Sequence, residues 1–74
     1  MQITVDLSGQ LSLSLPRHQI LEISPGATSG EVADQLGLNL EEIGLITING
    51  VRSELLDALP PDSRLYFFPY LSGG

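Results

Sequence analysis

The sequence contains no cysteine, tryptophan or lysine, and besides one histidine its only cations are Arg17, Arg52 and Arg64. Without a thiol the chain has no disulfide, no cysteine-ligated zinc or iron–sulfur centre and no thiol nucleophile. The single histidine, His18, completes neither a multi-histidine metal site nor a convincing Ser-His-Asp triad. We therefore expect no bound cofactor, no metal and no catalysis by this chain alone.

The chain is short and acidic: its 74 residues include 9 acidic and 3 basic side chains, for a formal net charge of −6. The length allows one small domain with a limited core. Three scattered arginines do not form the basic stripe that a phosphate backbone requires, and negative charge repels anionic membranes. We expect no nucleic-acid or membrane partner. A basic protein is the natural complement, unless the charge serves solubility alone.

Long hydrophobic runs are also missing. No uncharged apolar stretch of about 18 residues occurs, and residues 1–6 lack the basic start and apolar run of a signal peptide. Together with the missing cysteines, this favours a cytoplasmic location.

Alternation of apolar and polar residues marks the strand candidates in the first half of the chain. These are residues 3–7, 11–15 and 19–23, separated by turn-like residues 8–10 and by Pro16. A hairpin with a long first arm and three separate strands both fit, so the number of strands between Leu7 and Ile23 is one or two. His18, beside Arg17, is expected in an exposed loop.

A short helix is predicted over residues 28–36. Thr28 and Glu31 have the spacing of a capping box, and Gly37 lies where helices end in the left-handed conformation. The buried face would hold Val32, Ala33 and Leu36. The carboxylates of Glu31, Asp34, Glu41 and Glu42 are expected on a solvated helix face, or to steer a basic partner.

The second half of the chain predicts a further helical turn at 40–43 and strands at 45–48, 51–52 and 64–68. Asn49-Gly50 suits a two-residue hairpin turn, and residues 60–62 form another turn. The order of strands, one helix and further strands indicates an α+β domain, with the helix on one face of a mixed sheet.

The last strand alternates so that Leu65 and Phe67 would point into the core, while Tyr66 and Phe68 would point outward. Two outward aromatics near the end of the chain would make a docking patch. The alternative is that Phe68 folds under the tail and completes a small core.

The C-terminal pair Gly73-Gly74 is either an incidental floppy end or a functional tail. Residues without a β-carbon enter a narrow channel easily and bring the terminal carboxylate close to another protein's active site. Converted to an acyl-adenylate, that carboxylate would give a thiocarboxylate with sulfur or an amide with an amine.

The element order, the turns at Asn49-Gly50 and Pro61-Asp62 and, above all, residues 65–74 (Leu-Tyr-Phe-Phe-Pro-Tyr-Leu-Ser-Gly-Gly) resemble the sulfur-carrier family of ubiquitin-like proteins. The molybdopterin synthase small subunit is the most similar branch. The thiamine-pathway sulfur carrier is also similar, but it usually lacks the Phe-Phe-Pro.

The resemblance implies a ubiquitin-like β-grasp domain at 1–69 and a flexible tail at 70–74. It further implies that an E1-like adenylating enzyme uses ATP to activate Gly74, and that a sulfur donor protein then supplies the sulfur of a thiocarboxylate. In molybdopterin synthase this sulfur would go to the pterin precursor in the active site of the large subunit. Gly74 would bear the sulfur, with Gly73, Ser72 and Leu71 as the tail. Partner binding would fall to Phe68, which matches the family's interface residue, and to Tyr66, Pro69 and Tyr70.

Three alternatives remain open at the level of sequence. The chain could be a thiamine-type or other thiocarboxylate sulfur donor. It could also be a ubiquitin-like modifier conjugated through Gly74 to lysines of other proteins, or a non-covalent interaction module. Having no lysine, it cannot build side-chain isopeptide chains of itself.

Overall fold

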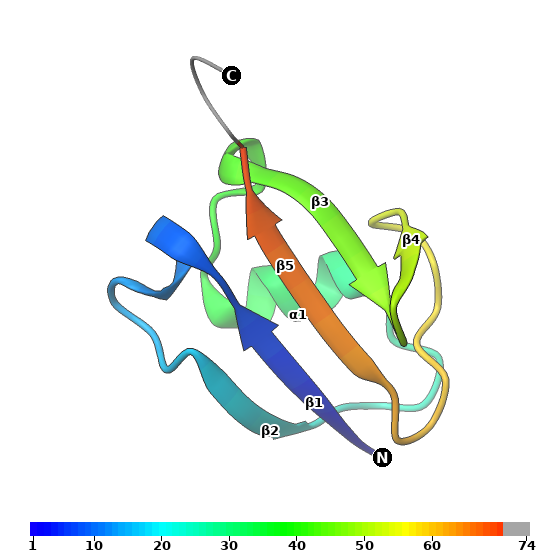
Figure 1. The fold of residues 1–74 in the computed structure, drawn as a ribbon. Helices are drawn as coiled ribbons and strands as arrows, with labels where there is room; N and C mark the ends of the chain where they lie inside the picture. Colours follow the sequence, from blue (N-terminus) through cyan, green and yellow to red (C-terminus); the bar gives the residue numbers. More distant parts are fainter. Residues whose placement is uncertain (71–74) are drawn as a thin grey trace.

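The computed structural model describes residues 1–70 and forms a five-stranded mixed sheet with one α-helix (Figure 1). The sheet order is β2-β1-β5-β3-β4, in which β1 and β5 run parallel and the other neighbouring pairs run antiparallel. The elements are β1 (Gln2–Leu7), a 3₁₀ turn (Gly9–Ser12), β2 (His18–Glu22), α1 (Ser29–Leu36), a second 3₁₀ turn (Leu40–Glu42), β3 (Ile43–Ile48), β4 (Val51–Ser53) and β5 (Arg64–Pro69). The predicted α+β class and mixed sheet are confirmed.

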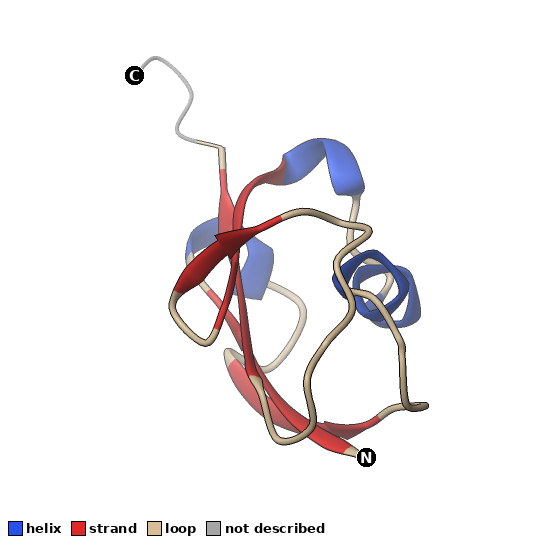
Figure 2. Cartoon of the chain, turned by 90° about the vertical axis from the view of Figure 1, so that its right-hand side faces the viewer, coloured by secondary structure: helices blue, strands red, loops and turns tan. Residues whose placement is uncertain are grey.

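The core lies between the sheet and α1, which covers one face of it (Figure 2). Alternate residues of β1 and β5 point toward the helix, and Val5, Leu65 and Phe67 are fully buried there. The predicted helix face meets them: Val32 and Ala33 are buried, and Leu36 packs against the core. Burial of these apolar side chains is the main source of stability in so small a domain.

Three local features form as the sequence predicts: the capping box, the end of the helix and the tight turn between β3 and β4. The hydroxyl of Thr28 accepts a hydrogen bond from the Glu31 backbone N–H at 3.2 Å, and the Glu31 carboxylate accepts one from the Thr28 N–H at 3.3 Å. Gly37 ends the helix in the left-handed conformation. Asn49 and Gly50, with φ of 52° and 82°, make the tight turn between β3 and β4.

Residues 11–15 do not form a strand, so β2 is the one strand between Leu7 and Ile23. The Leu7 N–H donates to the Arg17 carbonyl at 2.8 Å, which closes the β1–β2 pairing and leaves the intervening residues as a loop. Within that loop, Gly9 has a φ of 57° and begins the first 3₁₀ turn. The alternation at 11–15 therefore reflects a loop in which Leu11 is buried and Leu13 is exposed.

His18 is exposed as predicted, but it begins β2 rather than lying in a loop. Its backbone pairs with Asp6 of β1, which places the two side chains together. The helical turn predicted at 40–43 forms as the 3₁₀ turn Leu40–Glu42.

Within residues 1–70, no helix has the length and apolar character needed to cross a bilayer. The longest helix in that range, α1, has 8 residues.

Candidate functional site

The site predicted at the end of the last strand lies on the open face of the sheet, the side turned away from α1. Strand alternation puts it there: Leu65 and Phe67 are fully buried, so Tyr66 and Phe68 project from the opposite face of β5. The two rings stack, with centroids 4.2 Å apart and planes 4° from parallel. Phe68 lies outside the core, as the docking-patch interpretation requires.

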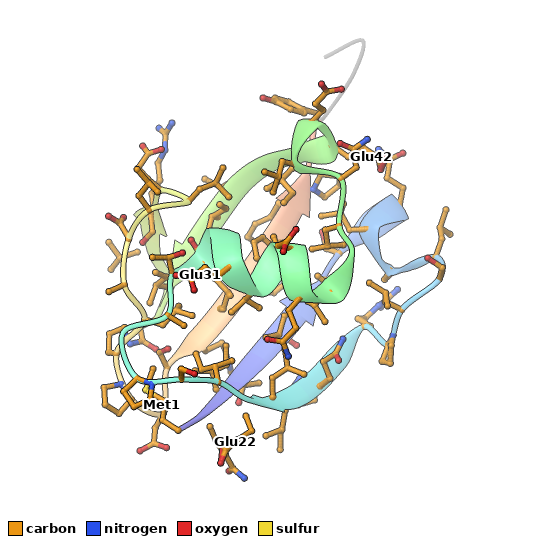
Figure 3. The ribbon with its side chains drawn as sticks, turned by 180° about the vertical axis from the view of Figure 1, so that it is seen from behind. Met1, Glu22, Glu31 and Glu42 are labelled. Atoms are coloured by element: carbon orange, nitrogen blue, oxygen red, sulfur yellow. The ribbon has the colours of Figure 1, made fainter. Side chains whose placement is uncertain are left out.

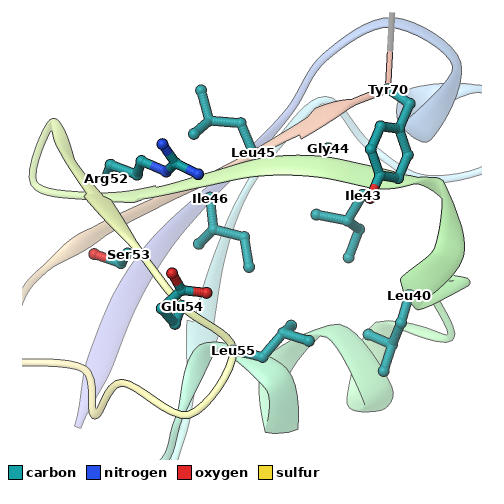
Figure 4. A pocket seen from close by; sticks show the side chains of 10 residues that line it. All are labelled: Leu40, Ile43, Gly44, Leu45, Ile46, Arg52, Ser53, Glu54, Leu55 and Tyr70. Carbon is teal, nitrogen blue, oxygen red and sulfur yellow. The ribbon is translucent and has the colours of Figure 1, made fainter. Parts of the chain in front are cut away.

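Strand pairing supplies the neighbours of this stack. Leu45 of β3 pairs with Phe68, and Thr47 pairs with Tyr66. Residues paired across a sheet share a face, so Leu45 extends the aromatic surface and Thr47 borders it. Figure 4 shows Leu45 and Arg52 on one side of β3, with Ile43 and Ile46 on the other. We name the set Leu45, Tyr66 and Phe68 the aromatic patch.

A shallow hollow of about 490 Å³ continues from the aromatic patch toward the end of β5. Phe68, Pro69 and Tyr70 line it, together with Leu45 and Gly44 of β3. The structure thus brings together the four residues predicted to bind a partner, because Tyr66 stacks on Phe68 and the other three share the hollow. Their partner role stays a prediction.

The course of the chain at Tyr70 depends on a glycine in β3. A Cβ built on Gly44 would lie 2.9 Å from the Pro69 carbonyl oxygen and 2.9 Å from the Tyr70 Cα. The β3–β5 register shifts at this point, and the Tyr70 N–H donates to the Glu42 carbonyl at 3.2 Å. Gly44 therefore allows the backbone of Tyr70 to lie directly against β3.

The tail residues Leu71, Ser72, Gly73 and Gly74 lie outside the described residues. β5 ends at Pro69, and Tyr70 is the last residue described. The division into a domain at 1–69 and a tail at 70–74 therefore stays a prediction.

Charged groups also gather on the open face. The Asp6 carboxylate accepts a hydrogen bond from His18 Nδ1 at 2.7 Å when that nitrogen is protonated, and it lies 3.9 Å from Arg64 Nε. Arg52 of β4 pairs with Thr47 and so shares this face. The aromatic patch thus lies between Arg52 of β4 and the Asp6–Arg64 pair of β1 and β5.

Reactive chemistry is sparse in the part of the chain that the structure describes. Residues 1–70 hold no group of three or more His, Asp or Glu side chains arranged to bind a metal ion. The hollows on this surface are open and shallow, and the Asp6–His18 pair lies on an exposed strand surface.

Sequence reasoning did not find Leu45, Gly44 or Arg52 as part of this site. Their signal is not local, since it depends on β3 lying beside β5 and β4 beside β3. The alternation of Leu45 and Thr47 with Ile46 and Ile48 predicts that the first two share a face, but not which strand lies next to them.

Comparison with protein-family models gives no match, and neither does comparison with curated protein sequences. Solved structures do match. Small archaeal modifier protein 1 of Haloferax volcanii superposes with a TM-score of 0.80 at 22% identity, covering 100% of both chains. The HVO 2177 protein of the same organism has a TM-score of 0.78 at 18% identity, covering 100% of this chain and 87% of that one.

A chain from the complex of subunits 1 and 2 of the molybdopterin-converting factor of Helicobacter pylori matches with a TM-score of 0.67 at 15% identity, and both chains are covered over 100% of their length. At such identities the likeness concerns the fold. With its mixed sheet and single helix, this chain has the ubiquitin-like β-grasp fold that the sequence predicted.

Proposed function

We propose that this chain is a ubiquitin-like sulfur carrier whose C-terminal carboxylate is activated by a partner enzyme. The observation that carries the proposal is the course of β5. This strand lies in the middle of the sheet, bears the Tyr66–Phe68 stack on its open face and leads through Pro69 and Tyr70 into a sequence ending in Gly73-Gly74. A docking surface and a slender reactive end are thus joined by a few residues of chain.

The chemistry takes place on Gly74 and is supplied by partners. The Gly74 carboxylate attacks ATP in the adenylating enzyme, forming an acyl-adenylate and releasing pyrophosphate. Hydrosulfide, or its equivalent from a sulfur donor protein, then attacks the acyl carbon; AMP leaves and the chain ends in a thiocarboxylate. The chain has no cysteine, so the sulfur cannot be carried as a persulfide on a side chain.

The proposed acceptor of the sulfur is a molybdopterin precursor bound by a large-subunit partner. Two observations support it: the Phe-Phe-Pro at residues 67–69, and the likeness to a chain from the molybdopterin-converting factor complex of Helicobacter pylori. In this view the aromatic patch contacts the large subunit while the tail carries Gly74 to its active site.

The carrier proposal is tested by mass spectrometry of the intact chain after incubation with ATP, an E1-like adenylating enzyme and sodium sulfide. We expect a gain of about 16 Da as the terminal –OH becomes –SH. A variant lacking Gly74 should stay unmodified and keep the fold. Exchange of pyrophosphate into ATP, in the presence of this chain, shows that the enzyme forms the acyl-adenylate. If the chain stays unmodified under those conditions, the proposal is contradicted.

A second candidate function is protein modification, favoured by the likeness to small archaeal modifier protein 1. An amine in place of sulfide would then attack the acyl-adenylate and give an isopeptide bond. Cells expressing the chain would then contain higher-mass adducts. A Ser72→Arg chain would let trypsin cut just before Gly73, so that each modified lysine of a target protein keeps a Gly-Gly remnant that mass spectrometry detects. The two functions are separated by whether the sulfide-dependent mass gain, the adducts or both occur.

A further inference from the structure

The side of the molecule that carries α1 has a one-sided charge. Six carboxylates come from α1, the second 3₁₀ turn and residues 54–57, which follow β4: Glu31, Asp34, Glu41, Glu42, Glu54 and Asp57. No arginine or histidine occurs in these three segments. Within residues 1–70, the ion pairs involve only Asp6 and Glu22, so none of the six has a cationic partner there. Figure 3 shows Glu31 and Glu42 on this side.

The same side exposes leucines. Leu56 is 87% exposed and Leu40 47% exposed, and both line a hollow along α1. Each lies next to carboxylates in the sequence: Glu41 and Glu42 follow Leu40, and Glu54 and Asp57 flank the Leu55-Leu56 pair. The lining of the hollow is more apolar than polar, and its volume is about 590 Å³. We name it the helix-side hollow, defined by Leu40, Leu55, Leu56, Glu31 and Asp34.

We propose that the helix-side hollow binds a basic amphipathic helix of a partner protein. The apolar side of the partner helix would cover the three leucines, and the lysines or arginines of that helix would face the surrounding carboxylates. Amphipathic helices bind in apolar grooves in this way. The charge selects this partner. Nucleic acid and anionic membranes are repelled by six carboxylates, whereas a basic helix gains from them both in encounter and in orientation.

This surface borders the one used in the proposed function, because Leu40 and Leu55 also line a hollow together with Leu45 and Tyr70 (Figure 4). Leu45 and Arg52 of the open face lie on the opposite side of β3 from Leu40 and Leu55 (Figure 4). The open face carries Arg52 and Arg64, but also the carboxylates of Asp6 and Glu22, so it lacks the one-sided charge of the helix side. Binding in the helix-side hollow needs no reaction at Gly74.

The test uses a synthetic peptide of about four helical turns, with leucines on one face and lysines on the other. A second peptide has the same composition in an order without an apolar face. Each is titrated into the isotopically labelled full chain and followed by NMR. We expect amide shift changes at Val32, Leu40, Leu55 and Leu56, weakening with added salt, and affinity for the scrambled peptide lower by about tenfold or more.

Matched variants locate the contact. Leu56→Ser removes an exposed leucine of the hollow, and Ile20→Ser removes one that is 63% exposed on β2. We expect the first to weaken peptide binding by about fivefold or more and the second to leave it unchanged, with both melting as the parent does. The paired substitution Asp34→Asn with Glu42→Gln should reduce the affinity and its dependence on salt.

Several results would overturn the inference. Equal affinity for the two peptides would mean that charge alone, and not the apolar face of the helix, causes binding. Shift changes confined to the open face would mean that the peptide does not bind in the helix-side hollow. A dimer of the chain, seen by sedimentation and lost in Leu56→Ser, would assign the hollow to a second copy. A chain lacking Gly74 should bind the peptide as the parent does, so that failure of the carrier chemistry and failure of this inference are distinguishable.

Discussion

Phe67 and Phe68 are neighbours in the chain, but they project from opposite faces of β5. Phe67 is fully buried against α1, while Phe68 stacks on Tyr66 on the open face. The first ring therefore contributes to folding and the second to the surface on which we propose a partner binds.

Replacing these two rings separates stability from binding. Phe67→Ala should cost about 3–5 kcal/mol, which is most of the stability of a small domain, so we expect a largely unfolded chain by circular dichroism. Phe68→Ala should fold normally, yet bind the activating enzyme or large subunit about 30-fold more weakly, as loss of an aromatic anchor does. A Phe68→Ala chain with parental affinity would show that the aromatic patch is not the docking surface.

Gly44 is the residue that lets Tyr70 lie against β3, and its replacement by alanine tests this contact. The added Cβ would meet backbone atoms of Pro69 and Tyr70, which no side-chain rotation can relieve. We expect Gly44→Ala to cost about 1–3 kcal/mol and to shift the amide signal of Tyr70. In the adenylation of Gly74 by the activating enzyme, we expect kcat to fall because the chain at Tyr70 is displaced. The KM for this chain should change little, because the aromatic patch is intact.

A glycine elsewhere provides the control for that experiment. Gly26 has φ of 86° and open space around its Cβ position. Gly26→Ala should therefore destabilise the fold through its backbone conformation while leaving the Tyr70 signal and the activation rate unchanged. Equal effects of the two variants on activation would mean that Gly44 acts through stability alone.

At the scale of elements, α1 is held at its start by the reciprocal Thr28–Glu31 hydrogen bonds. Thr28→Ala leaves the Glu31 N–H without this partner, and we expect a loss of about 1 kcal/mol in the free energy of unfolding. Thr28→Ser keeps the acceptor and should recover most of it. Urea denaturation measures both, and an unchanged midpoint for Thr28→Ala would contradict the role of the cap.

Elements governed by local interactions could be predicted from the sequence. The capping box fixed the start of α1, and Asn49-Gly50 fixed the β3–β4 turn because both residues tolerate positive φ. The alternation of β5 predicted which of its aromatics are buried. Each of these signals lies within a few residues of the feature that it predicts.

The alternating pattern at residues 11–15 predicted a strand that does not form, and its apolar positions do not share one environment: Leu11 is buried and Leu13 is exposed. The β1–β2 pairing closes at Leu7 and Arg17, so residues 11–15 lie in the loop that connects the two paired strands. Likewise, the contribution of Leu45 to the aromatic patch depends on β3 pairing with β5, two segments about twenty residues apart in the chain. Contacts of this kind are decided by topology, which local patterns do not contain.

At the scale of the whole molecule, charge is divided between the two faces. The ion pairs of residues 1–70 lie at the open face and at the N-terminus, while the helix side carries carboxylates without cationic partners. Repulsion among the latter opposes the folded state and is screened by salt.

This division predicts opposite effects of two neutral substitutions. Asp34→Asn should raise the melting temperature slightly, while Asp6→Asn should lower it by removing the partner of His18 and Arg64. Adding salt from about 20 to about 500 mM should stabilise the parent, and less so the Asp34→Asn chain. A parent chain destabilised by salt would show that attraction outweighs repulsion over the molecule.

The parallel pairing of β1 and β5 has a mechanical consequence. These strands are adjacent at the centre of the sheet, and the first enters from one end of the molecule while the second leaves at the other (Figure 1). A tension applied between the N-terminus and the end of β5 therefore loads the hydrogen bonds joining residues 4–7 to 64–67 in shear, so that they must break together. A pull on β2 from its Glu22 end against the N-terminus would instead open the β1–β2 ladder one bond at a time. We therefore expect a higher unfolding force when the chain is pulled between its N-terminus and the end of β5 than when it is pulled between its N-terminus and the Glu22 end of β2.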